Sequence, residues 1–527
     1  MNYITKPLFL ILSNFFLLGS DLELPIGLTE DEKKRKSEIY SMGRDTDPPP
    51  LPIRNISEFE PMSGVLIRYP FGIPIDLIEE MAQDVMIYCL VSSNLQNAAY
   101  NSMAGGSVNM DNVEFVLGST DSYWTRDYGP WWVVDGDRNM SVVDFTYNRP
   151  RPNDNDAPLK ISNHLNVPYF SADLIHCGGN YMTDGLGISA STDLVFEEND
   201  IANDQVLTMM EDYYGIETYH VVPDPNNTYI DHIDCWGKYL SPTKVLIREV
   251  PNSHPQFDEI EEISNYFSNS TTKWNEPWEL YRVWTPSNQP YTNSLILNDK
   301  VLVPITGSSW DEEALAVYSD AMPGYEVIGF SGSWESTDAL HCRIKGVPDL
   351  EMLQIFHNPL NDSIPPDSNG YKLDVIVDDL SESGLIPDSM KIYWKTDEIN
   401  NWNYTFLNYL DNIENPNGWS GWIPALADSS EIYYYIQSAD SSGRVEKNPP
   451  AGWHKFFAYP TNACIEWALG DLDNSGEINI IDILLLADEI IEGSISGSCS
   501  GFVSDINSDD QITIIDILLL INMISNP

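Results

Sequence analysis

Residues 65–93 read VLIRYPFGIPIDLIEEMAQDVMIYCLVSS and indicate the fold class of the central part of the chain. The apolar run VLIRY is followed by a helical segment that opens at Pro74 and then by a second apolar run, MIYCLVSS. Proline is tolerated in the first turn of a helix, and short apolar runs are typical of buried strands. The run VEFVLGS at residues 113–119 continues the alternation. Strands that alternate with helices over roughly 300 residues predict an α/β architecture.

The chain has 527 residues, which favours two or three domains. The proline-rich and polar stretch NPLNDSIPPDSNG at residues 358–370 marks a boundary. Beyond it the apolar period changes to two, and in YKLDVIVDD the residues of one face are Tyr371, Leu373, Val375 and Val377. We expect an all-β, immunoglobulin-like sandwich over residues 358–459.

The chain carries 80 acidic and 27 basic side chains, a formal net charge of −53. This charge repels nucleic acids and anionic membrane surfaces, so we expect no nucleic-acid partner. It would attract a cationic substrate. Solubility in a salty or extracellular setting, together with carboxylates that bind calcium, is the simpler explanation of the acidity.

The N-terminal 20 residues hold one lysine, Lys6, followed by an apolar stretch from Leu8 to Leu18 that is too short to span a bilayer. We predict a signal peptide at residues 1–20 and a protein that is secreted or attached to the cell surface, with no membrane span. Residues 21–54 are interpreted as a linker or pro-segment, in which Thr29 and Glu32 fit the capping box of a short charged helix.

The C-terminal residues contain an internal repeat. GDLDNSGEINIIDILLLADEI and SDINSDDQITIIDILLLINMI begin matching twelve-residue loops at Asp471 and Asp505, 34 residues apart. Oxygen-bearing side chains stand at loop positions one, three, five, nine and twelve: Asp471, Asp473, Ser475, Asn479 and Asp482, then Asp505, Asn507, Asp509, Thr513 and Asp516. Calcium prefers six to eight oxygen ligands, and a backbone carbonyl at position seven would complete each set. The loops therefore predict structural Ca²⁺.

Each loop leads directly into an apolar helix, IIDILLL, and no helix precedes it, so residues 460–527 resemble a type I dockerin domain. The resemblance implies a cohesin-type partner, and a calcium-stabilised sorting or anchoring tail is the alternative. Cys464 and Cys499 precede the two loops at near-equivalent positions. In an exported protein we predict that they form a disulfide.

The run YIDHIDCW at residues 229–236 holds a histidine, two flanking carboxylates and a thiol. As a strand, it would place His232 and Asp234 on one face and Cys235 on the other. By itself the run fits a histidine in an acidic loop. Four further motifs change that interpretation: SYWTRDYGPWW at 122–132, HCGGNYMTDG at 176–185, PYTNSLIL at 290–297 and STDALHCRI at 336–344.

Together these motifs resemble the bacterial, Porphyromonas-type peptidylarginine deiminases of the guanidino-group-modifying superfamily, with agmatine deiminases as more distant relatives. The resemblance covers residues 55–357. It implies the pentein fold, a five-bladed α/β propeller of ββαβ units with the active site at its central axis.

The resemblance assigns Cys342 as the nucleophile, His232 as the general acid and base, and Asp127 and Asp234 as the carboxylates that bind the guanidinium. Paired carboxylates match the planar N–H donors of a guanidinium. The implied reaction passes through a covalent thiouronium and releases citrulline and ammonia, with no cofactor for catalysis.

In the same family the motif YNRPRPND, here at residues 147–154, binds the carboxylate of a C-terminal arginine, which assigns that role to Arg149 and Arg151. The resemblance also predicts that the pocket is lined by Trp124, Tyr229, Asn293 and Thr337. Gly129 and Pro130 follow Asp127 as they do in agmatine deiminases, a departure from the peptidylarginine enzymes. Deimination of agmatine or free arginine is therefore the second hypothesis, and a non-catalytic displayed binding module is the third.

Overall fold

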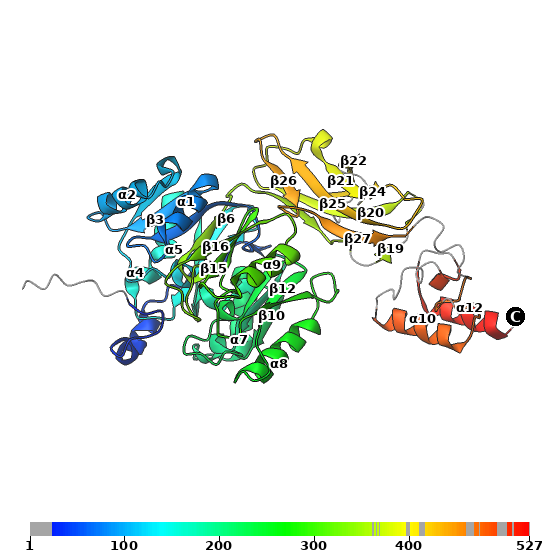
Figure 1. The fold of residues 1–527 in the computed structure, drawn as a ribbon, viewed down its shortest axis with the longest axis horizontal. Helices are drawn as coiled ribbons and strands as arrows, with labels where there is room; N and C mark the ends of the chain where they lie inside the picture. The colour runs from blue at the N-terminus through cyan, green and yellow to red at the C-terminus, as the bar shows by residue number, and fades with distance from the viewer. Residues whose placement is uncertain are drawn as a thin grey trace, which may run out of the picture.

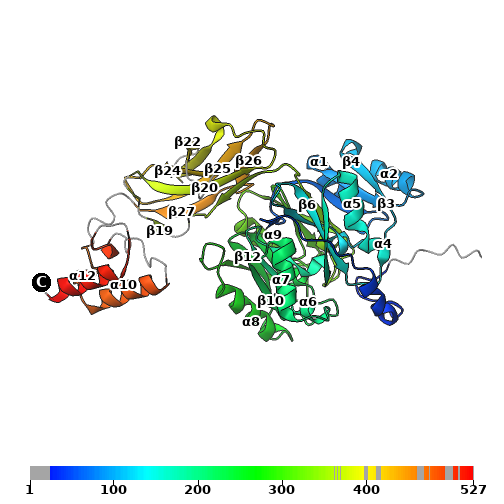
Figure 2. The same cartoon turned by 180° about the vertical axis from the view of Figure 1, so that it is seen from behind.

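The computed structural model of the protein is shown in Figures 1 and 2. The residues that the structure describes are 24–360, 363–364, 366–367, 369–396, 401–410, 417–459, 468–473, 475–492, 503–507 and 511–525. The predicted signal peptide, the predicted disulfide pair Cys464 and Cys499, and Asp509 lie outside them.

The α/β part of the described chain contains five separate sheets. In sheet order their strands are β17 (Lys345–Pro348), β2 (Met62–Arg68), β3 (Met86–Val91) and β4 (Val113–Leu117); β1 (Arg54–Asn55), β5 (Trp131–Val134), β6 (Met140–Tyr147) and β7 (Tyr169–His176); β8 (Met182–Thr183), β9 (Ile188–Thr192) and β10 (Thr218–Val222); β11 (Gly237–Ser241), β12 (Lys244–Glu249) and β13 (Glu279–Trp284); and β14 (Leu295–Leu297), β15 (Lys300–Ile305) and β16 (Glu326–Ser331).

Each sheet repeats one unit, in which an antiparallel pair is followed by a parallel pair. A parallel pair needs a crossover, and here a helix supplies it. The crossover helices are α1 (Ile75–Asp84), α5 (Ala157–Leu165), α7 (Asn203–Tyr214), α8 (Phe257–Ser268) and α9 (Asp311–Ala321). Strand β17 returns from the end of this region to pair with β2, so the first and last units share a sheet.

The sequence of α1 explains why its segment is a helix packed on a sheet. The described chain places Pro74 at its N-cap, and Leu77, Ile78, Met81 and Ala82 are buried on one face. This is the three-to-four-residue spacing of an amphipathic helix. The predicted strand, helix and strand of residues 65–93 are confirmed as β2, α1 and β3.

Further short helices lie in the loops between these elements, and some of them hold the predicted catalytic residues. They are η2 (Met110–Asn112), α2 (Gln96–Gly105), α3 (Thr125–Tyr128), α4 (Pro152–Asn155), η3 (Gly178–Asn180), α6 (Leu194–Glu197), η4 (Ile233–Cys235) and η5 (His341–Arg343). Helix α3 contacts both η3 and η5, and η3 contacts η4. Loops from four different units therefore meet at one place.

A sheet-rich region follows, with two sheets seen above the green helices in Figure 1. In sheet order, the first sheet consists of β18 (Leu353–His357), β20 (Tyr371–Asp379), β24 (Gly418–Ile423) and β23 (Asn408–Tyr409). The second consists of β19 (Ser363–Ile364), β27 (His454–Ala458), β25 (Ser430–Ala439), β21 (Lys391–Thr396) and β22 (Asn403–Phe406), and β26 (Val445–Asn448) pairs with β25. The short helix η6 (Pro387–Ser389) precedes β21. Burial alternates along β20, as its period of two predicts. Strand β18, which lies before the predicted boundary at residue 358, pairs with β20.

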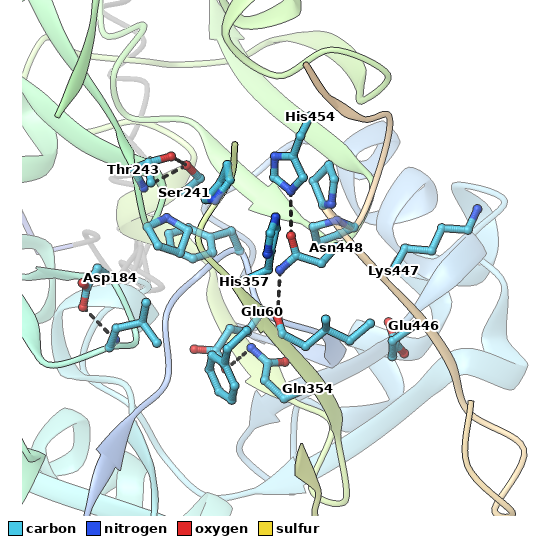
Figure 3. A pocket seen from close by; sticks show the side chains of 18 of the residues that line it. Glu60, Asp184, Ser241, Thr243, Gln354, His357, Glu446, Lys447, Asn448 and His454 are labelled. Carbon is cyan, nitrogen blue, oxygen red and sulfur yellow. Dashed lines mark hydrogen bonds between the residues drawn. The ribbon is translucent and has the colours of Figure 1, made fainter. Parts of the chain in front are cut away.

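A pocket of about 90 Å³ lies between the α/β region and the sheet-rich region (Figure 3). Gln354 donates a hydrogen bond to Glu60 across it (3.0 Å), and Arg444 pairs with Asp349 nearby (2.6 Å). None of the predicted catalytic residues lines this pocket. It is a feature of the junction between the two regions.

Helices α10 (Ile480–Glu492) and α12 (Ile514–Ser525) pack against each other and bury Leu486 and Leu520. They follow the two predicted calcium loops. Among the described residues, no helix is long and apolar enough to cross a membrane.

Candidate active site

The four predicted catalytic residues come together, although they lie in separate loops. Asp127 is on α3, His232 and Asp234 are at η4, and Cys342 is on η5. The thiol of Cys342 lies 3.5 Å from Asp234 Oδ2, and His232 Nδ1 lies 3.9 Å from Asp127 Oδ1. All four side chains are buried, with Cys342, His232 and Asp127 at 0% exposure.

The strand predicted for residues 229–236 is wrong, because Ile233–Cys235 forms a 3-10 turn. The side-chain oxygen of Asn180 accepts hydrogen bonds from the backbone N–H groups of Ile233 (3.3 Å) and Thr192 (2.9 Å). Within the run, the backbone N–H groups of Cys235 and Trp236 donate to the carbonyl oxygens of His232 (3.2 Å) and Ile233 (3.1 Å), and these bonds close the turn. Cys235 is buried at 4% exposure, and its thiol is 3.7 Å from Asp234 Oδ1.

Glycines of the HCGGN motif let the catalytic groups approach each other. A Cβ atom on Gly179 would lie 2.6 Å from Asp127 Oδ1 and 2.7 Å from His232 Nδ1. A Cβ on Gly178 would lie 1.9 Å from the carbonyl oxygen of Arg126. A side chain at Gly179 would therefore displace Asp127 or His232, and one at Gly178 would displace the backbone that carries Asp127.

Asn293 holds the loop that carries the thiol. Its Nδ2 donates to Cys342 Sγ (3.2 Å), and its Oδ1 accepts from the backbone N–H groups of His341 (3.1 Å) and Cys342 (3.3 Å). Burial, followed by the charges of Asp234 and Asp127, raises the pKa of the Cys342 thiol well above its usual range. In this state of the site the cysteine is protonated at neutral pH.

The charge balance of the site calls for a cation. Neither oxygen of Asp127 accepts a hydrogen bond from an N–H or O–H group of the described residues, and burial together with the Asp234 charge raises its pKa well above the usual range. Burial also lowers the pKa of His232 to about 3, so the imidazole is neutral at pH 7. A bound cation between Asp127 and Asp234 would favour both carboxylates.

A chain of buried polar groups supports Asp234 from behind. His341 links Asp234 Oδ2 (2.8 Å from Nδ1) to Glu58 Oε2 (2.7 Å from Nε2). Glu58 is also paired with Arg126 (2.6 Å) and Lys238 (2.7 Å). Burial would raise the pKa of Asp234, but the hydrogen bond and charge of His341 lower it overall. A cavity of about 50 Å³ borders Glu58, His341 and Asp234.

The predicted substrate-binding residues lie around this centre. Arg149 and Arg151 are buried at 5% and 1% exposure, and the Arg151 guanidinium lies 5.5 Å from the ring centre of Trp124. Thr337 is buried at 6%. Tyr229 is 68% exposed, so it stands at the edge of the site rather than inside it.

Residues 73–348 match the family model of the Porphyromonas-type peptidyl-arginine deiminases, and residues 469–525 match that of the type I dockerin domain. The chain belongs to the Porphyromonas-type peptidyl-arginine deiminase family. It is therefore a guanidino-modifying deiminase, a hydrolase that acts on carbon–nitrogen bonds, and it carries a dockerin domain.

Relatives of this deiminase include agmatine deiminases. It is 24% identical to the agmatine deiminase of Medicago truncatula over 300 residues, which cover 46% of this chain and 79% of the relative. Its fold matches the agmatine deiminase of Enterococcus faecalis with a TM-score of 0.51 at 18% identity, covering 56% of this chain and 96% of that one. It also matches a crystal structure whose protein is provisionally described as a peptidyl-arginine deiminase, with a TM-score of 0.51 at 19% identity, covering 56% and 99%. The α/β region therefore has the fold shared by these deiminases.

Among the residues that the structure describes, ligand atoms converge in two places as a metal site would require. One atom each from Asp127, Cys177 and His232 lies within 4.8 Å of the others. Burial, followed by the Asp127 charge, raises the pKa of the Cys177 thiol well above its usual range. Two members of this cluster, Asp127 and His232, are also among the residues predicted for guanidinium chemistry.

The second place is the first dockerin loop, where oxygens of Asp471, Asp473 and Asp482 lie within 4.8 Å of one another. Asp482 accepts backbone hydrogen bonds from Leu472 (2.7 Å) and Asn479 (2.8 Å). In the second loop Asp516 accepts the equivalent bonds: from Ile506 (2.9 Å) and Thr513 (2.8 Å). The twelfth residue of each loop therefore accepts the same pair of backbone hydrogen bonds, and the side chains at the ligand positions of the sequence form the all-oxygen set that calcium prefers.

Several residues of the deiminase site carry no signal in a single sequence. Glu58, Arg126 and Lys238 belong to it only because distant loops meet there. His341 stands beside Cys342 in the LHCR motif, and that adjacency is the one signal that could have found it.

Proposed function

We propose that this deiminase hydrolyses the guanidinium of a peptidyl arginine, with a free C-terminal carboxylate preferred, to citrulline and ammonia. The observation that carries the proposal is the buried, unsatisfied carboxylate of Asp127, which lies with Asp234 beside Cys342 and His232. Two buried carboxylates beside one thiol suit a planar, multiply donating cation, and a guanidinium has that chemistry.

The chemistry follows from the placement of the thiol. A guanidinium held between Asp127 and Asp234 puts a positive charge next to Cys342 and lowers the thiol pKa that burial has raised. Cys342 passes its proton to His232 and attacks the guanidinium carbon as the thiolate; the imidazolium of His232 then gives that proton to the amino group, which leaves as ammonia when its C–N bond breaks. The remaining covalent thiouronium is hydrolysed when His232 accepts a proton from water, which adds to the carbon and expels the thiolate.

The substrate preference rests on the arginine pair. Arg149 and Arg151 are buried beside Trp124, and Arg151 already holds a carboxylate, that of Glu32, at 2.7 Å. A pocket of this kind suits the terminal carboxylate of a peptide. Agmatine carries no carboxylate, so it would leave both guanidinium groups of the pocket without that partner.

Agmatine remains the competing substrate for a specific reason. Gly129 and Pro130 follow Asp127 in the pattern of agmatine deiminases, and the relatives from Medicago truncatula and Enterococcus faecalis carry that name. A non-catalytic displayed module is the other alternative.

One assay separates the three functions. The wild type and Cys342→Ala are incubated with a peptide that ends in arginine, the same peptide with an amidated C-terminus, and agmatine, and citrulline, carbamoylputrescine and ammonia are measured. We expect turnover of the free-carboxylate peptide at least about tenfold faster than of the amidated peptide, the ratio for one charge-assisted contact, and none with Cys342→Ala. Product from agmatine alone would sink the peptidyl assignment, and no product from any of the three would favour the binding module.

We also infer the properties of the remaining parts from their chemistry. The five sheets, closed by the β17–β2 pair, support the five-bladed propeller, and the two packed sheets of residues 353–458 support the immunoglobulin-like sandwich. The dockerin loops are proposed to hold Ca²⁺ and to bind a cohesin-type partner. Such a partner, together with the predicted signal peptide, fits a secreted or surface-attached enzyme.

A further inference from the structure

The arginine pair of the site is occupied by the chain's own N-terminal segment, residues 24–41. The carbonyl oxygen of Ile26 accepts a hydrogen bond from Arg149 Nε (3.0 Å). The carbonyl oxygens of Pro25 and Gly27 accept from Arg151 Nη2 at 2.7 and 3.1 Å. The carbonyl oxygens of three consecutive residues are therefore held by the two arginines assigned to the substrate.

Glu32 completes the occupation with a carboxylate. Its Oε1 lies 2.7 Å from Arg151 Nε and its Oε2 lies 3.3 Å from Nη2, the forked arrangement of an arginine with a carboxylate. Burial would raise the pKa of Glu32, but the hydrogen bond from Arg151, with help from Thr29, lowers it to about 2. Glu32 is thus ionised at neutral pH and presents the same group as the C-terminus of a peptide.

A capping box fixes the direction of the Glu32 side chain. Glu32 Oε2 accepts from the backbone N–H of Thr29 (2.8 Å), and Thr29 Oγ1 accepts from the backbone N–H of Glu32 (3.2 Å). This confirms the pattern predicted for Thr29 and Glu32, although the helix that follows, η1 (Glu32–Ser41), is of the 3-10 type. Figures 1 and 2 both show η1, in dark blue, next to α4.

Residues of the segment also make apolar contacts at the edge of the site. Ile26 is 2% exposed and belongs to the buried cluster that contains Trp124, Ile230 and Cys342. A Cβ atom on Gly27 would lie 2.4 Å from the Tyr229 ring, so the bare backbone of Gly27 rests against that ring. Arg149, Arg151 and Tyr229, half of the residues predicted to bind substrate, are therefore in contact with residues 25–32.

A basic run follows directly after the occupied residues. Residues 33–36 read KKRK, which is four of the 27 basic residues of the chain. The side chains of Lys33 and Arg35 are 56% and 41% exposed and pair only locally, with Glu30 (2.6 Å) and with Asp31 (3.2 Å) and Glu38 (3.0 Å). An exposed run of lysine and arginine in a short terminal helix is accessible to proteases that cut after basic residues.

We propose that residues 24–32 inhibit the enzyme by occupying the carboxylate-binding subsite as a substrate-like peptide, and that cleavage within residues 33–36 activates it. The uncut segment acts at a high effective concentration because it is tethered, and one cut converts it into a dissociable peptide. The proposal rests on the proposed function, because it takes Arg149 and Arg151 to be the subsite for the substrate carboxylate.

The test uses the full chain in five forms: intact, nicked with trypsin, Glu32→Gln, Glu30→Gln, and a variant with residues 33–36 all changed to glutamine. Glu30 is the matched control, because it lies on the same segment but its side chain is 85% exposed and pairs with Lys33 at the surface. Two quantities are measured: the KM for a peptide ending in arginine, and the rate at which 2-chloroacetamidine, a small amidine electrophile, alkylates Cys342. The alkylation is followed by mass spectrometry and needs no turnover.

We expect nicking and Glu32→Gln each to lower KM and to raise the alkylation rate by about tenfold or more, the ratio expected when charge-assisted hydrogen bonds are lost. Glu30→Gln should match the intact chain. A variant with residues 33–36 all changed to glutamine should stay slow after trypsin treatment, which shows that the cut in this run is the activating one.

The two proposals fail differently. Equal alkylation rates in the intact, nicked and Glu32→Gln forms would overturn self-inhibition. Faster alkylation after nicking with no turnover of any arginine substrate would instead uphold self-inhibition and overturn the proposed reaction. A Glu30→Gln variant that behaves like Glu32→Gln would reduce the effect to surface charge and would also overturn self-inhibition.

Discussion

Replacing Glu58 by glutamine keeps the size of the side chain but removes the charge that holds three neighbours. Glu58 lies 2.6 Å from Arg126 and 2.7 Å from both Lys238 and His341. Breaking a buried charge network typically costs about 3 to 5 kcal/mol, largely because the remaining charges lose their partner. For a domain of this size we expect the thermal midpoint to fall on the order of 10 °C.

The variant should also lose activity, because His341 carries the effect to Asp234. His341 Nδ1 is 2.8 Å from Asp234 Oδ2, the oxygen that lies 3.5 Å from the thiol of Cys342. Losing one charge-assisted hydrogen bond costs roughly 1.5 to 3 kcal/mol. At about 1.4 kcal/mol for each factor of ten, kcat/KM should fall roughly 10- to 100-fold.

Glu60→Gln is the control that separates the two effects. Glu60 is also buried and pairs with Arg54 (2.8 Å) and Gln354 (3.0 Å), but it borders the junction pocket and not the catalytic centre. Both variants are assayed with a peptide ending in arginine at a temperature where circular dichroism shows them folded. Glu60→Gln should be less stable than the wild type, but its kcat/KM should stay within about a factor of two of the wild-type value. The reason is that Glu60 lies away from the catalytic centre, so its charge does not act on the transition state. Equal activity losses in the two variants, or full activity in Glu58→Gln, would refute the reasoning.

Three further predictions concern the thiols, the buried histidines and calcium. The kcat of Cys235→Ser should stay within a few-fold of the wild-type value, whereas Cys342→Ser should form no citrulline. An inactive Cys235→Ser would contradict our choice of nucleophile. Burial lowers the pKa of His232 to about 3 and those of His176 and His357 to about 4, so each of these imidazoles should stay neutral in the folded protein at about pH 5. An NMR titration of the histidine ring resonances should therefore show no protonation of these three side chains between about pH 7 and pH 5, and a ring that titrates near its ordinary value of about 6.5 would count against its burial in the neutral form. Chelation of calcium should open the dockerin helices to proteolysis while citrulline formation continues, and loss of turnover on chelation would contradict the separation of the two modules.

Local sequence patterns predicted the elements well, because helix and strand periods depend on neighbouring residues. Residues 65–93 form the predicted β2, α1 and β3, and the alternation of YKLDVIVDD appears as alternating burial along β20. The prediction of a strand for residues 229–236 was wrong. That run is too short and polar for its period to decide its conformation. Backbone bonds from Cys235 to His232 and from Trp236 to Ile233 close it into a turn, and the side chain of Asn180, more than fifty residues away, accepts from the backbone N–H of Ile233.

By itself, the sequence determined the residue types of the site and the order of its motifs, because Cys342, His232, Asp127 and Asp234 each stand in a recognisable local run. Only the tertiary structure decided which further carboxylates contact its residues. Glu58 meets His341 across 283 positions of sequence, and Glu32 meets Arg151 across 119. An ion pair between distant loops depends on distance in space and leaves no period in the chain, so no reading of neighbouring residues could place either one.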